Sequence, residues 1–303
     1  MTVLLDAILP LPVFGKGKVR DTYDLGDALL IVVTDRISAF DVVLPCGIPD
    51  KGAVLNQMAA FWFEKTAQLV PNHVIKTVNF LNDMKPYISN IDMLPDYLSG
   101  RSMVVKKAKV IPVECVVRGY LSGSAWEEYK KQGTISGVQQ PEGLQESQEL
   151  PQPLFTPTTK AQTGHDMPLT WKELEKQIGN KLANEVKEKS LAVYNYARGY
   201  ARQRDIIIAD TKFEFGIING EVSLVDEVLT PDSSRFWDVR SYVIGRSQPS
   251  FDKQPVRDWL DKSGWNKQPP APVLPDDVIQ ATARRYRKAY RLLTGRELQH
   301  VSG

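Results

Sequence analysis

The segment 206–216, IIIADTKFEFG, constrains the fold more than any other part of the chain. Its apolar start, Ile206–Ile208, predicts a buried strand. Asp210, Lys212 and Glu214 then alternate with other residues, so a continuing strand would project all three from one face. A solvated edge strand would not explain the apolar start or the aromatic residues between the charges. The segment therefore predicts a strand that carries charged groups into a site.

A turn at Asn219-Gly220 follows, and the returning strand ends in two further carboxylates, Asp226 and Glu227. Mg²⁺ in nucleotide sites is held by one or two carboxylates together with phosphate oxygens. Several carboxylates and one lysine on a single hairpin therefore predict a site for a magnesium nucleotide.

A second charged segment, FGKGKVRDTY, begins at Phe14. Two glycines allow the backbone to approach a ligand closely, and Lys16, Lys18 and Arg20 alternate, so on a strand they would share one face. Such a segment can cradle phosphate. It is neither a Walker A loop nor a dinucleotide fingerprint, and its nearest analogue is the Gly-rich hairpin that covers ATP in kinases. A plain basic hairpin remains the alternative.

Three more segments offer groups that bind anions. Arg118 ends a predicted strand just before Ser124 opens a helix, and an arginine beside a helix N-terminus suits phosphate or carboxylate. The loops TPTTK (156–160, continuing to Asp166) and TPDSSR (230–235) are ordinary when each is taken alone. Together these segments gather cations and hydroxyls around the predicted nucleotide site, which indicates more than one anionic ligand.

The remaining pattern predicts a first lobe of sheet with one helix, ending near Lys109, and a second half richer in helix. Strands are expected at 29–33, 73–79, 102–108 and 111–117, and helices at 53–70, 122–132 (capped by Ser122 or Ser124), 171–204 with a break near Gly179, and 276–296. The segment 139–153 is expected to be a surface loop, and the proline-rich stretch 249–275 to be irregular.

Composition excludes several classes of protein. Lys and Arg total 38 against 36 Asp and Glu, so the net charge of +2 gives no sign of a nucleic-acid partner. The two cysteines and three histidines are scattered, so their spacing forms no zinc site. No signal-like start and no run of ~18 apolar residues is present, so we expect a cytoplasmic protein with no membrane partner.

Six segments resemble, in order, the motif series of the phosphoribosylaminoimidazole-succinocarboxamide synthase (SAICAR synthetase) family. They are GKGKVRDTYD, DRISAFD, VECVVRGYLSGSAW, TPTTKAQTGHD, DTKFEFG and VDEVLTPDSSRFW, running from Gly15 to Trp237. The length of the chain, with its proline-rich stretch and final helix, resembles the longer form of the family, which implies a monomer.

The resemblance implies an α+β, ATP-grasp-like two-lobed fold with antiparallel sheets and an ATP cleft between the lobes, here 1–109 and 110–303. It also implies a ligase that forms a C–N bond in de novo purine biosynthesis. ATP, L-aspartate and carboxyaminoimidazole ribonucleotide (CAIR) would give SAICAR, ADP and phosphate, with Mg²⁺ and an acyl phosphate intermediate. Preorganised cations and metal would stabilise the charge that develops.

The resemblance further implies roles for individual residues. Contacts with ATP are implied for Gly15, Lys16, Gly17, Lys18, Arg20, Val113 and Glu214. The implied metal ligands are Glu214 and Asp226. Catalytic roles fall to Asp210 and Lys212, near the CAIR carboxylate, and to Lys160. The CAIR phosphate would meet Arg118, Ser124 and Arg235, while Asp166 lies in a loop near the phosphates and Ser38 and Asp41 are candidates for the aspartate side.

The register of the 206–225 hairpin decides whether the two implied metal ligands can meet. A two-residue turn would pair Ile218 with Glu221, whereas a three-residue loop would pair Ile217 with Glu221. Only the second puts Asp226 on the face of Glu214, because a slip of one residue flips every side chain. We therefore predict the three-residue loop with Gly220 at positive φ, whereas the two-residue turn would favour Glu227 as the ligand.

Two other classes of protein share part of this pattern. A kinase-type phosphotransferase should carry a catalytic Asp–Asn loop, and the sequence shows none at the expected spacing. A module that binds RNA or nucleotide without catalysis should interleave aromatics with a basic stripe, whereas the aromatics here fall mostly in apolar runs. Aspartate-dependent release of ADP separates a ligase from both.

Overall fold

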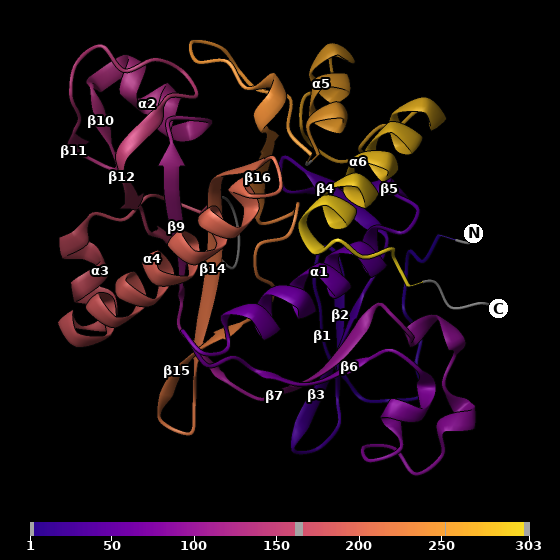
Figure 1. The fold of residues 1–303 in the computed structure, drawn as a ribbon. Helices are drawn as coiled ribbons and strands as arrows, with labels where there is room; N and C mark the ends of the chain where they lie inside the picture. The colour runs from indigo at the N-terminus through magenta and orange to yellow at the C-terminus, as the bar shows by residue number, and fades with distance from the viewer. Residues whose placement is uncertain (1–2, 161–165, 252, 300–303) are drawn as a thin grey trace.

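The computed structural model describes residues 3–160, 166–251 and 253–299, and its ribbon is built around two antiparallel sheets (Figure 1). The first sheet has the strand order β1-β2-β3-β7-β6. Its strands are β1 (Val13–Lys16), β2 (Arg20–Asp24), β3 (Ala28–Val33), β7 (Ser102–Lys106) and β6 (Val74–Val78). A separate hairpin, β4 (Arg36–Ala39) with β5 (Val42–Gly47), follows β3 in the chain.

The second sheet is centred on the long strand β14. Its order is β12-β9-β14-β15, and β13, β16 and β8 pair with these strands. Their bounds are β8 (Lys109–Val110), β9 (Val113–Tyr120), β12 (Glu149–Phe155), β13 (Thr158–Thr159), β14 (Ile206–Ile218), β15 (Glu221–Val225) and β16 (Ser234–Asp238). A small hairpin of β10 (Thr134–Ile135) and β11 (Val138–Gln139) stands apart.

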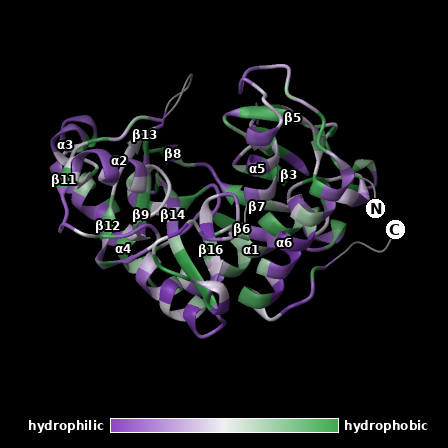
Figure 2. Ribbon diagram, turned by 90° about the horizontal axis from the view of Figure 1, so that it is seen from above, coloured by the Kyte–Doolittle hydropathy of each residue, from purple (hydrophilic) through white to green (hydrophobic). Residues whose placement is uncertain are grey.

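Helices cover the sheets and join them. α1 (Lys51–Thr66) packs on the first sheet, and α4 (Asn180–Arg202) packs on β14 and β9. The others are α2 (Ser124–Gln132), α3 (Trp171–Ile178), α5 (Gln254–Lys262) and α6 (Asp276–Thr294), with short 3₁₀ turns at Leu81–Met84, Ile91–Met93, Asp96–Leu98 and Val239–Ser241. Figure 2 shows hydrophobic residues along the central strands, whereas α3 at the edge is mostly hydrophilic.

One apolar core runs through both parts of the molecule. Met58 and Trp62 of α1, Ile208 and Phe213 of β14, and Tyr290 of α6 all belong to it. The chain passes from the first sheet to the second between β7 and β8, at the expected position near residue 109. However, α6 returns to pack against α1, so the division into 1–109 and 110–303 stays a prediction.

The predicted helices and strands are confirmed, with three exceptions. The segment 139–153 contains the start of β12, an edge strand that tolerates Pro151 and Pro153 because one of its sides makes no ladder bonds. The proline-rich stretch contains α5, with a proline at its start. Helix α2 is capped by Gly123 at φ 57° rather than by either serine. No helix among the described residues has the length and apolarity that crossing a bilayer requires.

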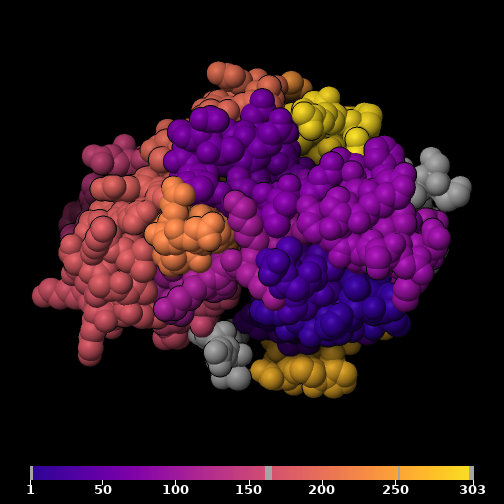
Figure 3. Space-filling model, turned by 90° about the horizontal axis from the view of Figure 1, so that it is seen from below, coloured from indigo at the N-terminus to yellow at the C-terminus, as the bar shows by residue number. Residues whose placement is uncertain are grey.

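The turn between β14 and β15 differs from the prediction. Ile218 pairs with Glu221, so the turn has two residues, and the predicted three-residue loop is wrong. Asn219 has φ 51° and Gly220 φ 84°, as a type I′ turn requires, and this turn matches the right-handed twist of the strands. The positive φ of Gly220 is confirmed. Seen from below, this hairpin reaches the surface between the region of α3 and α4 and the N-terminal part of the chain (Figure 3).

Candidate active site

The Gly-rich segment forms the β1–β2 hairpin, whose turn is closed by the Gly17 N–H donating to the Arg20 carbonyl at 2.7 Å. Lys16 pairs with Asp6 at 2.5 Å and Lys18 pairs with Asp41, all on the exposed surface. Arg20 instead turns inward. The prediction that the three cations share one face is wrong, because strand alternation holds only within a strand and the turn separates Lys16 from Arg20.

Arg20 joins the first sheet to the carboxylates that follow β15. Its guanidinium lies 2.5 Å from Asp226 and 3.1 Å from Glu227. Burial lowers the pKa of Arg20, but the two carboxylates outweigh burial and raise it. Arg20 is thus a fixed cation at the base of the Gly-rich hairpin.

Asp226 lies in the electrostatic field of Glu214 despite the two-residue turn. Strand β15 ends at Val225, which pairs with Glu214, and Asp226 follows with φ 64°. A left-handed residue no longer obeys the alternation of the strand, so the register does not decide its direction. Burial raises the pKa of Asp226, Arg20 opposes that rise and Glu214 adds to it. Although the predicted register is wrong, the observed register does not exclude Asp226 as a metal ligand in favour of Glu227.

Two lysines accompany these carboxylates. Lys160, just after β13, pairs with Glu214, and Lys212 of β14 pairs with Glu114 of β9 at 2.5 Å. Burial raises the pKa of Glu114 against the effect of Lys212, and Asp166 adds to the rise. The predicted loop residues Lys160 and Asp166 thus both lie near this group, while residues 161–165 between them are outside the described residues.

The segment around Val113, whose backbone the family resemblance places against the adenine of ATP, crosses from one sheet to the other. The Ile111 N–H donates to the Phe215 carbonyl at 2.8 Å, which ties this crossing to β14. Val113 begins β9, and its side chain is buried. At Val113, only the backbone could therefore meet a ligand.

Two arginines converge on Asp210 because three strands bring them there. Asp210 of β14 is in register with Arg118 of β9 on one side and with Arg235 of β16 on the other. Arg118 lies 3.4 Å from the Asp210 carboxylate and donates to Ser124 Oγ at 3.2 Å, and Arg235 also pairs with Asp210. Burial lowers the pKa of Arg118, although a guanidinium stays charged at neutral pH.

A cavity of about 210 Å³ lies over this cluster. Its lining brings together five residues singled out from the sequence: Arg118, Ser124, Asp210, Lys212 and Arg235. Gly123 beside it has φ 57° and ψ −134°, a conformation that favours glycine, and a Cβ there would also force the Arg235 guanidinium, 2.5 Å away, to shift. Small polar groups, an open helix end and several cations equip this cavity for an anionic ligand.

Sequence reasoning missed a buried cluster that supports the cavity. Asp232, which lines it, accepts from Lys51 at 2.8 Å and from the Tyr286 hydroxyl at 2.5 Å, and pairs with Lys253 at 3.2 Å. Burial would raise the pKa of Asp232, but the two lysines reverse this and lower it. The partners of Asp232 come from α1 and from the C-terminal part of the chain, so no local sequence pattern could have predicted them.

Ser38 and Asp41 lie elsewhere. Both belong to the β4–β5 hairpin, where Asp41 has φ 64° in the turn and pairs with Lys18. Neither is among the described residues that line the cavity. The structure therefore brings Asp41 to the Gly-rich hairpin rather than to the arginine cluster.

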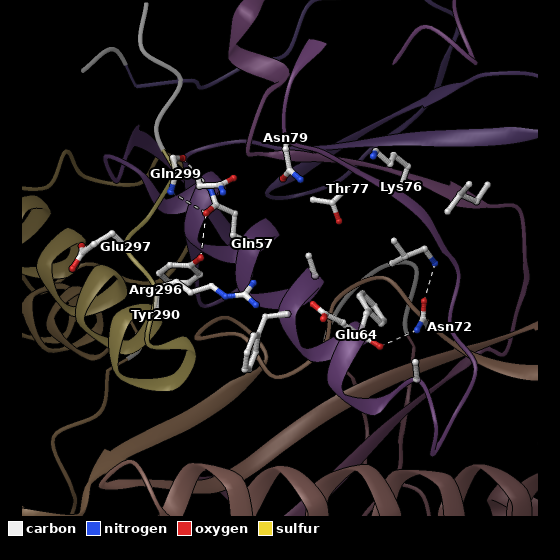
Figure 4. A pocket seen from close by; sticks show the side chains of 16 residues that line it. Gln57, Glu64, Asn72, Lys76, Thr77, Asn79, Tyr290, Arg296, Glu297 and Gln299 are labelled. Carbon is white, nitrogen blue, oxygen red and sulfur yellow. Dashed lines mark hydrogen bonds between the residues drawn. The ribbon is translucent and has the colours of Figure 1, made fainter. Parts of the chain in front are cut away.

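A larger cavity, about 580 Å³, lies away from the predicted chemistry (Figure 4). It is bounded by α1, β6 and the segment after α6, and three of its polar residues bond to one another. The Tyr290 hydroxyl donates to Gln57 Oε1 at 3.3 Å, and the Gln299 N–H donates to the same oxygen at 3.1 Å. None of the residues predicted to carry chemistry lines it, so the smaller cavity is the candidate site.

Among the described residues, no group of three or more His, Cys, Asp or Glu side chains could hold a metal ion by itself. A magnesium nucleotide does not require one, since phosphate oxygens and water complete the coordination. Glu214 and Asp226 supply the hard oxygen donors that Mg²⁺ prefers.

Known proteins match this chain over nearly its whole length. Residues 13–272 match the family model described as SAICAR synthetase. The chain is 52% identical over 279 residues to a phosphoribosylaminoimidazole-succinocarboxamide synthase of Thermodesulfovibrio yellowstonii (92% of this chain, 94% of that one), and 51% identical over 290 residues to that of Syntrophobacter fumaroxidans (95% of each). The solved structure of a Saccharomyces cerevisiae SAICAR synthase complexed with SAICAR superposes with a TM-score of 0.87 at 43% identity, covering 99% of both chains.

Proposed function

The chain belongs to the SAICAR synthetase family, and from that premise we propose how its residues divide the work of the reaction. The protein is a ligase that uses ATP to join L-aspartate to CAIR through a C–N bond in purine biosynthesis. Its fold is the ATP-grasp-like fold of that family. ATP is therefore a substrate.

The CAIR phosphate is assigned to Arg118, Ser124 and Arg235. The observation that carries this assignment is the convergence of two arginines from separate strands on one carboxylate beside the start of α2. A dianionic phosphate is a stronger acceptor for two forked guanidiniums than the single Asp210 carboxylate that they now share. Lys212 and Asp210 line the same cavity, which supports their place near the CAIR carboxylate.

The ATP phosphates are assigned to the Gly15–Lys18 turn, with Arg20 behind it and the backbone at Val113 beside adenine. Mg²⁺ is assigned to Glu214 and Asp226, whose oxygens suit it and which interact electrostatically. Bound Mg²⁺ would neutralise charge on the phosphates. Lys160 and Arg20, which now pair with these two carboxylates, would then be available to phosphate oxygens.

The reaction follows from the weakness of a carboxylate as an electrophile. An oxygen of the CAIR carboxylate attacks the γ-phosphorus of ATP, so a P–O bond forms to the carboxylate while the bond to ADP breaks. The aspartate amine then attacks the acyl carbon, forming the C–N bond and expelling phosphate, and the amine loses a proton. Lys212 and Lys160 stabilise the negative charge that develops on the transferred groups.

Ordered omission of substrates tests the proposal. With ATP, Mg²⁺, CAIR and L-aspartate, we expect release of ADP in step with SAICAR. Sustained ADP release without aspartate would instead indicate a phosphotransferase, and absence of turnover with all substrates would indicate a binding protein. Size-exclusion chromatography tests the further proposal of a monomer, for which the expected mass is 34.1 kDa.

A further inference from the structure

A fourth cation enters the candidate cavity from a part of the chain that none of the motifs covers. Arg257 belongs to α5, whereas Arg118, Lys212 and Arg235, the other cations of the described lining, belong to strands of the second sheet. Figures 1 and 2 both show α5 and α2 on opposite sides of those strands. Arg257 therefore comes to the cavity from an element that supplies none of the residues assigned to the phosphate.

Helix α5 is held firmly where it meets the cavity. Lys253, just before the helix, pairs with the buried Asp232 at 3.2 Å, and its carbonyl accepts from the Arg257 N–H at 3.0 Å. Val256 and Leu260 of the same helix are buried in an apolar cluster with residues of the β4–β5 hairpin and α6. The backbone at Arg257 is thus fixed relative to the loop that precedes Arg235.

The charges of the substrates identify a ligand for this cation. CAIR carries a phosphate and a carboxylate, for which Arg118, Arg235 and Lys212 are already assigned. L-Aspartate brings two further carboxylates to the same cavity, because its amine must reach the CAIR carboxylate. The earlier candidates for aspartate, Ser38 and Asp41, supply no cation, and Asp41 is itself an anion paired with Lys18.

We propose that Arg257 is a substrate-binding residue that holds a carboxylate of L-aspartate. The assignment rests on the proposed function, since it requires the cavity to be the site of ligation. A guanidinium held by a fixed helix can bind a carboxylate through two parallel hydrogen bonds and orient the amine toward the acyl carbon.

Steady-state kinetics with each substrate varied in turn tests this assignment. Arg257→Gln removes the charge and the fork, and Arg257→Lys keeps the charge alone. Lys262→Gln is the matched control, because it removes one positive charge from the exposed last turn of the same helix. Thermal unfolding of each variant shows whether it is folded, and if Arg257→Gln does not fold, Arg257→Lys carries the test.

For Arg257→Gln we expect the aspartate KM to rise roughly 10- to 100-fold, as for loss of a hydrogen bond between charged groups, while the KM values for CAIR and ATP change little. Arg257→Lys should lie in between, and Lys262→Gln should match the parent. A rise in the CAIR KM instead, or no change in any KM, would overturn the assignment. Failure of the proposed function would look different, because the parent enzyme itself would then show no turnover dependent on aspartate.

Discussion

His73 should make the stability of the protein depend on pH in a way that one substitution can isolate. Its side chain is 3% exposed beside the sheet at the start of β6, and its ring lies 5.2 Å from that of Phe63. Among the described residues, no hydrogen-bond partner reaches its Nε2. Burial lowers the pKa of His73 to about 3, and the charge of Arg20 adds to the effect.

The sign and size follow from proton linkage. The folded state keeps His73 neutral, whereas the unfolded chain takes up a proton below its ordinary pKa of about 6.5. His73 therefore leaves the free energy of unfolding undiminished above that pH and lowers it progressively as the pH falls toward 3. Between pH 7.5 and pH 5 the loss amounts to about 2 kcal/mol, set only by the unfolded-state pKa because the folded side chain stays neutral at both values.

Urea unfolding of the parent, His73→Phe and His73→Gln at pH 7.5 and pH 5 measures this loss. Every other titrating group is common to the three proteins, so the difference between them isolates His73. We expect both variants to lose about 2 kcal/mol less than the parent over this interval, whatever their absolute stability. Parallel pH dependence in all three would mean that the folded protein protonates His73, and would refute the reasoning.

Other predictions concern the ligand sites. Asp226→Asn should reduce turnover by roughly 100-fold or more at ordinary Mg²⁺ concentration while the fold persists, because a proposed metal ligand is lost. Glu221→Gln on the same hairpin is the control. Near-normal activity of the Asp226→Asn variant would contradict the metal assignment. Arg235→Lys should mainly raise the CAIR KM, and a change confined to the ATP KM would reassign the arginine to nucleotide. Hydrogen exchange at Gly15–Lys18 should slow when ATP and Mg²⁺ bind, and equal exchange with and without nucleotide would favour a plain basic hairpin.

The sequence was most informative where chemistry is local. Arg118 and Ser124, six residues apart, and the alternating charges of β14 could be placed because strand period and helix start are properties of short segments. The cluster around Asp232 could not be placed in this way. Its partner Lys51 stands 181 residues away, and only the packing of α1 and α6 around the core brings them together.

The hairpin register shows a subtler limit. Asn-Gly strongly favours the observed two-residue turn. The prediction of a three-residue loop rests only on the need for Glu214 and Asp226 to share a face, which holds for a regular strand through Asp226. The left-handed backbone at Asp226, φ 64°, ends the alternation instead. The alternation of side chains along a strand therefore predicts their direction only as far as the last residue that is paired in the sheet.

Charge pairing explains why a site for anions leaves so little trace in the composition. Five of the basic residues assigned to a ligand meet a carboxylate: Arg20 with Asp226, Lys160 with Glu214, Lys212 with Glu114, and Arg118 and Arg235 with Asp210. Such pairing keeps the net charge at +2 and limits the cost of burying isolated cations. Under the proposed assignments, binding of CAIR and magnesium nucleotide would exchange these partners: phosphate groups would pair with the cations, and Mg²⁺ would bind the carboxylates of Glu214 and Asp226. Glu214 and Asp226, the proposed metal ligands on the β14–β15 hairpin, would have to change partners together. Because Glu214 and Lys212 are neighbours on one face of β14, we expect binding of nucleotide and binding of CAIR to be energetically coupled.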